Sequence, residues 1–251
     1  MANEHVQIEF DKHVASVALN DPDRHNALGF AMFDALDAAL GELASNESAR
    51  VILLHGRGRS FCAGFDLAAA RDDPAVMAAF IRRLGTLLRA LRRAPQPVVA
   101  AVHGAAIAGG CAIVSACDLV VVSATARLGY PVHRLGVSPA VTIPTLQAAV
   151  GPGAARTLLM GGELMDGAAA QRIGLATQVS HDDAAVVPDA RALCRTLSGH
   201  GAVALRATKA WLNELDGTLD DDRLDGPVRD SEDLAASEAG QAELLRRMKK
   251  L

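Results

Sequence analysis

The sequence predicts an α/β protein in which a mostly parallel sheet is followed by a purely helical tail. Up to about residue 180, short apolar segments typical of buried strands alternate with segments of helical periodicity. This interleaving is the pattern of βαβ units. From about Pro188 onward every strong pattern is helical. We therefore expect a core over residues 1–190 and a C-terminal helical region over residues 191–251.

The apolar periodicity gives the order of the elements. Alternating apolar and polar residues predict a hairpin near the start, and apolar residues at helical spacing predict the helices. In chain order the predicted elements are a hairpin over 6–10 and 14–19, a helix over 29–45, a strand over 51–54, a helix over 74–93, a strand over 97–103, a helix over 110–117, a strand over 119–122, a helix over 146–160 interrupted near Gly151, a helix over 168–173, a strand over 177–179, and helices over 189–198, 203–215 and 231–250.

The composition is that of an ordinary globular protein and excludes several classes. Of the 251 residues, 50% are hydrophobic and 22% are charged, with 25 Lys and Arg against 29 Asp and Glu. This balance excludes a disordered or collagen-like chain. The net charge of −4 and the 3% aromatic content argue against a nucleic-acid partner, which needs a basic face or stacking aromatics.

The cysteines and the N-terminal residues predict a cytoplasmic protein with free thiols. The four cysteines form no CxxC pair, so neither a metal site nor a redox motif is expected. No basic segment followed by an apolar one marks a signal peptide at the N-terminus. Residues 97–117 are almost free of charge, but the internal glycines predict a strand, a turn and a helix rather than a membrane span.

Two glycine-containing turns are the best candidates for chemistry. They lie at 62–66 and 108–111, where predicted strands end. Backbone N–H groups at such points are unpaired and can point at a ligand oxygen, and the small residues Ala63 and Gly109 would let that oxygen come close. Two such donors would form an oxyanion hole for an acyl thioester enolate. The alternative is that both are simply tight turns that need glycine for steric reasons.

Taken together, several motifs resemble the enoyl-CoA hydratase/isomerase (crotonase) superfamily. The resemblance covers nearly the whole chain and is carried by residues 23–28 (DRHNAL), 58–67 (GRSFCAGFDL), 97–104 (PVVAAVHG), 108–111 (AGGC) and 116–119 (ACDL), with support from 128–131 and 168–175. It implies a crotonase-like ββα spiral with a C-terminal helical trimerisation region. It also implies an acyl-CoA ligand and a homotrimer or a hexamer built as a dimer of trimers.

The resemblance also implies roles for particular residues. The oxyanion-hole amides fall on Ala63 and Gly109. The path of CoA would be lined by Arg24, Ala27, Ala63, Asp66 and Leu67. Arg24 would meet a CoA phosphate or remain a solvated loop arginine, and Asp66 would face the ligand or cap a turn. Beyond the CoA thioester itself, no cofactor is expected.

The sequence departs from the family pattern where hydratases of this family carry two glutamates. Those positions are Ala112 and Val132. Since hydration of an enoyl thioester needs a base and an acid, ordinary hydration by the usual pair is not expected. His133 and Tyr130 are the candidate replacements. In a regular strand, however, His133 would point away from the face of Val132.

We therefore expect an acyl-CoA lyase or isomerase that stabilises a thioester enolate. One alternative is a non-catalytic acyl-CoA binding protein, and another is a CoA-thioester hydrolase or decarboxylase that uses His133 or Tyr130. Ser138 is a weaker candidate, and Cys111 is expected to be a small packing residue. The basic residues over 246–250 would either contact CoA phosphates or form a solvated helix end.

Overall fold

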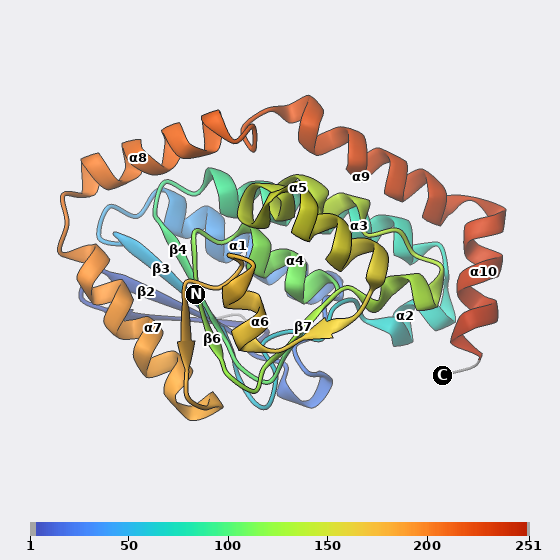
Figure 1. Ribbon diagram of the computed structural model, residues 1–251, viewed down its shortest axis with the longest axis horizontal. Coiled ribbons are helices and arrows are strands. Elements are labelled where there is room, and N and C mark those ends of the chain that lie inside the picture. Colours follow the sequence, from blue (N-terminus) through green and yellow to red (C-terminus); the bar gives the residue numbers. More distant parts are fainter. Residues whose placement is uncertain (1–3, 250–251) are drawn as a thin grey trace.

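A six-stranded sheet forms the centre of the molecule. The computed structural model describes residues 4–249. The strand order is β1-β2-β3-β4-β6-β9 (Figure 1), and only the β1–β2 pair is antiparallel. The strands are β1 (Val6–Asp11), β2 (Val14–Leu19), β3 (Val51–Gly56), β4 (Val98–Val102), β6 (Leu119–Ser123) and β9 (Gln178–Ser180). The predicted α/β fold is confirmed.

A second, smaller sheet lies at the carboxyl ends of β4 and β6. It has three short strands in the order β5-β7-β8, with bounds β5 (Ala105–Ile107), β7 (Arg127–Gly129) and β8 (Leu164–Met165). These strands were not predicted, because segments of two or three residues are too short to show a period. The pairing of β5 with β7 brings the 108–111 turn beside Gly129.

Ten α-helices surround the two sheets within residues 4–249. They are α1 (Phe30–Ala44), α2 (Leu67–Asp72), α3 (Val76–Arg93), α4 (Gly109–Ala116), α5 (Ile143–Gly161), α6 (Gly167–Arg172), α7 (Asp183–Ser198), α8 (Ala202–Leu215), α9 (Asp221–Ala236) and α10 (Glu238–Met248). Short 3-10 helices occupy Pro22–Arg24, Pro131–Leu135 and Ala140–Thr142. None of the described helices is long and apolar enough to cross a lipid bilayer.

The middle strands β2, β3 and β4 of the central sheet are buried on both faces. Along β3, Ile52 and Leu54 face the main core, which also contains residues of α1, α3 and α4, whereas Val51 and Leu53 face α7. A strand covered on both faces reads as a continuous apolar run, as is usual in parallel sheets. Because α7 is one unbroken helix on this sheet, the predicted boundary at residue 190 falls inside it.

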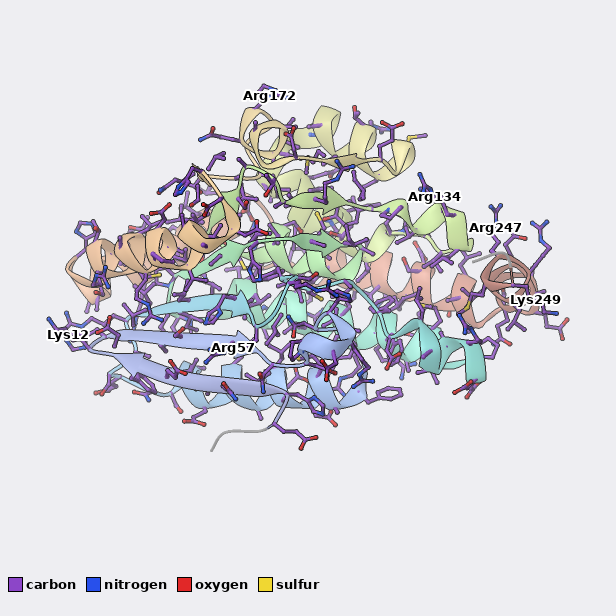
Figure 2. The ribbon with its side chains drawn as sticks, turned by 90° about the horizontal axis from the view of Figure 1, so that it is seen from below. Lys12, Arg57, Arg134, Arg172, Arg247 and Lys249 are labelled. Atoms are coloured by element: carbon purple, nitrogen blue, oxygen red, sulfur yellow. The ribbon has the colours of Figure 1, made fainter. Side chains whose placement is uncertain are left out.

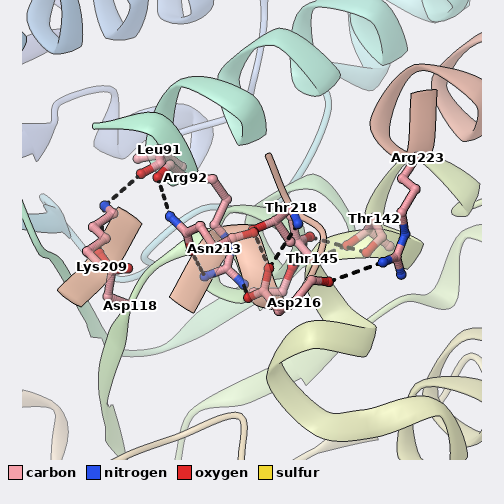
Figure 3. Close-up of polar contacts among 11 residues, drawn as sticks. Leu91, Arg92, Asp118, Thr142, Thr145, Lys209, Asn213, Asp216, Thr218 and Arg223 are labelled. Atoms are coloured by element: carbon pink, nitrogen blue, oxygen red, sulfur yellow. Dashed lines mark hydrogen bonds and ion pairs between the residues drawn. The ribbon is translucent and has the colours of Figure 1, made fainter. Parts of the chain in front are cut away.

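The C-terminal helices form an arm that crosses the top of the molecule (Figure 1). Helix α8 is fixed to the core by Lys209, whose Nζ pairs with Asp118 at 2.8 Å and donates to the carbonyl of Leu91 (Figure 3). The same Nζ also donates to the carbonyl of Gln96. Helix α9 lies against α3 through ion pairs such as Arg82–Glu232. The arm is therefore held by charged contacts at buried and exposed positions.

The prediction of a single helix over 231–250, beginning at Ser231, is wrong. Ser231 lies inside α9, which begins after Asp220, and the chain breaks at Ser237 before α10 begins. The carboxylate of Asp220 accepts from the first N–H groups of α9, and the Ser237 hydroxyl does the same for α10. Pro227 lies within α9 and hides the helical pattern, since proline usually marks a helix boundary.

Candidate active site

The chain segment before α2 runs between two neighbouring segments and bonds to them alternately. Cys62 exchanges hydrogen bonds with the β5 side, through the Ala105 carbonyl and the Ile107 N–H. Residues 63, 64 and 66 bond to the other side, where the Ala63 N–H donates to the His25 carbonyl at 3.0 Å. In an extended segment successive groups point to opposite sides. The Phe65 N–H therefore points toward the 107–109 turn.

The Phe65 N–H, rather than that of Ala63, is the unpaired donor of this turn. Within residues 4–249 no protein acceptor bonds to the Phe65 N–H, whereas the Ala63 N–H is already engaged. The structure therefore moves the expected donor from Ala63 to Phe65. Sequence reasoning missed Phe65 because the choice depends on the bridge between Phe65 and Leu28, which the local pattern does not show.

Gly109 supplies the second unpaired N–H group. It is the first residue of α4, and the first helical bond begins only at Ala112, whose N–H donates to the Ala108 carbonyl. Ala108 has φ 52° and ψ −111°, a conformation that costs a non-glycine residue about 1–3 kcal/mol. This strained residue sets the direction of the Gly109 N–H, which also lies at the positive end of the helix dipole.

The two turns are in close contact. A Cβ added to Gly64 would lie 3.6 Å from the Gly109 nitrogen, and one added to Gly109 would lie 3.5 Å from the Phe65 ring. The absence of side chains at both glycines therefore allows the two backbones to approach each other. Two unpaired N–H groups thus lie at one place on the molecule.

Two apolar cavities adjoin these N–H groups and share Phe65, Ala108, Val132 and Val137. Cavity A has a volume of about 140 Å³ and is lined by Ala63, Phe65, Leu67, Met77, Ile107, Ala108, Pro131, Val132, Leu135 and Val137. Cavity B, of about 30 Å³, is lined by Phe65, Ile81, Leu84, Ala108, Gly109, Ala112, Tyr130, Val132, Val137, Ser138, Pro139, Val141 and Thr142. Both cavities can hold at least one small group beside the unpaired N–H groups of Phe65 and Gly109.

The positions expected for glutamates both face cavity B. Ala112 lies in the first turn of α4, and Val132 lies in the 3-10 helix Pro131–Leu135. No Asp, Glu or His is found among the residues that line cavities A and B in the described chain. The polar side chains of cavity B are the hydroxyls of Tyr130, Ser138 and Thr142.

Tyr130 belongs to a buried hydroxyl network on the wall of cavity B. Its hydroxyl lies 3.2 Å from Thr142 Oγ1, which in turn lies 3.4 Å from Ser115 Oγ. Ser115 also contacts Thr145 at 2.8 Å. Burial raises the pKa of Tyr130 well above its ordinary value. The group is therefore a neutral hydroxyl at physiological pH.

His133 points away from both cavities. The segment is a 3-10 helix instead of the strand considered from the sequence, and His133 Nε2 lies 2.6 Å from the Leu159 carbonyl on α5. Because a carbonyl only accepts, Nε2 carries the proton in this contact. His133 does not line either cavity, so the structure brings Tyr130, but not His133, to the unpaired N–H groups.

The residues expected along the CoA path lie together in the loop that ends at α2. Arg24 pairs with Asp21 at 2.7 Å and with Asp66 at 2.9 Å, and its side chain is about half exposed. The other Asp66 oxygen accepts from the Ala68 and Ala69 N–H groups. Asp66 therefore caps α2, whatever further contact it makes, and Leu67 lines cavity A.

Asn26 holds this loop in place and was not singled out from the sequence. It is fully buried, has φ 56°, and its amide nitrogen donates to the carbonyls of Arg57, Ser60 and Phe61. Its carboxamide oxygen accepts from the Asp21 N–H. A buried asparagine that uses both ends of its amide is a specific positioning group.

The basic C-terminal residues lie at the far end of the molecule from Arg57 (Figure 2). Arg57 pairs with Glu9, whereas Arg246 and Arg247 both pair with Glu243 on their own helix. Lys250 lies outside the described residues.

Comparison with known proteins assigns the chain to a family. The model of the enoyl-CoA hydratase/isomerase family matches residues 9–223. A putative enoyl-CoA hydratase from Thermus thermophilus is 38% identical over 216 residues, which are 84% of this chain and 85% of the relative. The chain belongs to the enoyl-CoA hydratase/isomerase family. A crotonyl-CoA hydratase from Syntrophomonas wolfei is 30% identical over 85% of this chain and 83% of its own length.

Solved structures of the enoyl-CoA hydratase/isomerase family share the fold. A family member from Mycobacterium paratuberculosis superposes with a TM-score of 0.86 at 25% identity, covering 97% of this chain and 98% of the other. An enoyl-CoA hydratase from Mycobacterium avium gives 0.84 at 28% identity, with 99% and 98% covered. The predicted crotonase-like fold is confirmed.

Proposed function

We propose that this member of the enoyl-CoA hydratase/isomerase family binds acyl-CoA thioesters and stabilises the thioester enolate with the N–H groups of Phe65 and Gly109. The observation that carries the proposal is that both N–H groups lack a protein acceptor and adjoin apolar cavities. Oriented donors beside low-dielectric space favour an oxygen on which negative charge develops. Small apolar cavities suit the acyl group.

The CoA moiety would lie along the loop of Arg24, Ala27, Asp66 and Leu67. Leu67 and Ala63 line cavity A, which supports an approach from this side. Arg24 is half exposed and held by two carboxylates, so a CoA phosphate would compete for its outer N–H groups. Apart from the CoA thioester the reaction would need no cofactor.

The lining of cavity B favours enolate chemistry that needs no carboxylate base. Ala112 and Val132 cannot move a proton, and Tyr130 is the hydroxyl beside them. In a malonyl-type CoA thioester, cleavage of the bond between the α-carbon and the carboxylate carbon releases CO₂ and leaves its electron pair as the thioester enolate, without a base. The Tyr130 hydroxyl would then orient this enolate or donate the proton that its α-carbon takes up. This reaction class is our second, narrower candidate. A protein that only binds acyl-CoA would need the same N–H pair.

Calorimetry with a matched pair of CoA esters tests the proposal. A short acyl-CoA thioester offers a carbonyl oxygen, whereas the corresponding CoA thioether has a methylene in its place. We expect the thioester to bind at least about tenfold more tightly than the thioether. Its carbonyl oxygen can accept from two N–H groups, and each such hydrogen bond contributes about 0.5–1.5 kcal/mol. Equal affinities would reject a role for the N–H pair.

Turnover is followed with the same protein. Loss of the conjugated enoyl absorbance of crotonyl-CoA reports hydration, and release of CO₂ from malonyl-type CoA esters reports decarboxylation. Decarboxylation without hydration would support the narrower candidate. Binding without either reaction would leave an isomerase, a hydrolase or a protein that only binds acyl-CoA.

Assembly and location complete the proposal. The exposed apolar residues Val203, Trp211, Leu212 and Leu215 on α8 support association into a trimer or hexamer, because exposed apolar groups on one helix favour contact with another copy. The four cysteines are buried free thiols, which supports a reducing cytoplasmic environment.

A further inference from the structure

A third cavity, cavity C, lies under the C-terminal arm, next to cavities A and B. Cavity C is enclosed between the 136–138 loop, Met77 of α3 and the helices α9 and α10, and its volume is about 10 Å³. A space of about this size holds one water molecule or one small chemical group. Most of its wall is apolar, including Leu234 and Leu244.

Two serine hydroxyls without partners interrupt this apolar wall. Ser231 on α9 is 2% exposed, and its Oγ has no hydrogen-bond partner in the structure. Ser138 lines the same cavity and makes no side-chain hydrogen bond to any described residue. A buried hydroxyl without a hydrogen-bond partner destabilises the folded protein. Such a group is explained when something outside the protein chain satisfies it.

One layer of side chains separates cavity C from cavities A and B. Val137 and Ser138 line both cavity B and cavity C, and Met77 and Val137 line both cavity A and cavity C. Methionine is flexible and adapts its shape to its neighbours. A rotation of the flexible Met77 side chain, which lines both cavities, would therefore connect cavity A with cavity C.

We propose that cavity C binds a neutral oxygen substituent on the distal part of the acyl chain, with Ser231 and Ser138 as its hydrogen-bond partners. This inference rests on the proposed function and names its substrate class as acyl-CoA thioesters that carry a hydroxyl or ketone away from the thioester. Serine hydroxyls both donate and accept, so they match either group.

The chemistry of cavity C excludes a charged substituent. Among residues 4–249 no Lys, Arg or His lines the cavity, and a carboxylate moved into apolar surroundings without a cationic partner is strongly disfavoured. A plain methyl end would leave both hydroxyls unpaired. We therefore expect affinity to be highest for a hydroxyl or ketone, lower for a methyl group and lowest for a carboxylate.

Calorimetric titration of the full chain with a ladder of acyl-CoA esters tests this ranking. Each ester of increasing chain length is paired with its ω-hydroxy and ω-carboxy analogues. At the chain length that reaches cavity C, the hydroxy ester should bind about threefold to tenfold more tightly than the plain ester. In Ser231→Ala this advantage should disappear, whereas the plain ester should bind at least as well as before.

The variants also separate the inference from a purely structural role of Ser231. Because the hydroxyl is unpaired in the free protein, Ser231→Ala should leave the midpoint of urea unfolding unchanged or raise it. Ser138→Ala should lower the same hydroxy-ester advantage. Ser198→Ala, on the distant helix α7, is the matched control and should change neither quantity.

Three results would overturn the inference. Equal affinities for hydroxy and plain esters at every chain length would show that cavity C does not bind the oxygen substituent. A fall in stability of Ser231→Ala, with equal losses for both esters, would show that the serine only holds a buried water. If plain esters bind and the ω-carboxy esters bind best, the ranking is reversed. Failure of every CoA ester to bind would instead reject the proposed function.

Discussion

The two ends of α4 differ in how completely their polar groups are bonded. At the carboxyl end, Asp118 accepts from the Val98 N–H at 2.7 Å and from Lys209 at 2.8 Å. Lys209 donates its remaining N–H groups to the carbonyl of Leu91 (Figure 3) and to that of Gln96. At the amino end, Gly109 offers an N–H that no described protein group accepts.

This difference separates structure from function along one short helix. A fully bonded buried charge fixes the position of α8 on the core. An unpaired donor beside an apolar cavity stabilises nothing in the free protein and is useful only to a ligand. The comparison can be tested by changing one end at a time and measuring stability and ligand binding separately.

The largest effect, on stability, is expected at the carboxyl end of α4. Lys209→Met leaves the carboxylate of Asp118 and two carbonyls without their buried partner, and should lower the free energy of unfolding by about 3–5 kcal/mol. Urea denaturation followed by circular dichroism measures this. Lys12→Met, at an exposed lysine (Figure 2), is the control and should stay within about 0.5 kcal/mol. A comparable loss in both variants would contradict the comparison.

The next largest effect, on turnover and ligand binding, is expected at the amino end of α4. Gly109→Pro removes the N–H group, and loss of one oxyanion donor lowers kcat about 10²–10³-fold in other enzymes. The preference for a thioester over a thioether should fall in parallel. Gly109→Ala keeps the N–H, and its Cβ would lie 2.9 Å from the flexible end of Leu28 and 3.5 Å from the Phe65 ring. If both variants lose the preference equally, the donor role is wrong.

A smaller, stabilising effect is expected at Ala108. Ala108→Gly removes the Cβ that is strained at φ 52° and should raise the free energy of unfolding by about 1 kcal/mol, after the extra entropy of glycine in the unfolded chain is subtracted. Ala106→Gly in β5 is the matched control and should destabilise, because that residue is fully buried in a strand. Destabilisation by both changes would mean that Ala108 is not strained.

The smallest effect appears only at alkaline pH. Tyr130 is the one tyrosine of the chain, and burial raises its pKa well above the ordinary value of 10.0. Because the unfolded chain loses this proton first, the contribution of Tyr130 to stability is full below pH 10.0 and is lost as the pH rises. Ultraviolet titration should therefore show no tyrosinate near pH 10.0 in the native protein and ionisation in the denatured one. Equal titration would place Tyr130 in contact with solvent.

The sequence predicted the order of the main elements and the location of the two turns, because long apolar periods and glycine-rich turns are local signals. It assigned the first donor to Ala63 instead of Phe65, because that choice depends on which backbone groups of residues 63–66 bond to His25 and Leu28. The direction of His133 also required the three-dimensional structure, since a 3-10 helix and a strand place that side chain differently.

The pairing of distant helices was beyond sequence reasoning for the same reason. Ser231 was interpreted as a helix start, whereas the packing of α9 on α3 buries it at cavity C. Close contact between Gly85 and Val228 permits that packing, since a Cβ on Gly85 would lie 2.6 Å from Val228. No local pattern connects residues so far apart in the chain.

The exposed apolar face of α8 has a practical consequence through Trp211. It is the sole tryptophan of the chain, and 64% of it is exposed in the single protomer. Its fluorescence emission therefore reports one location, with no background from other indoles. Dilution of an assembled form should shift the emission maximum to the red as water reaches the ring, so a cuvette experiment follows association without any label.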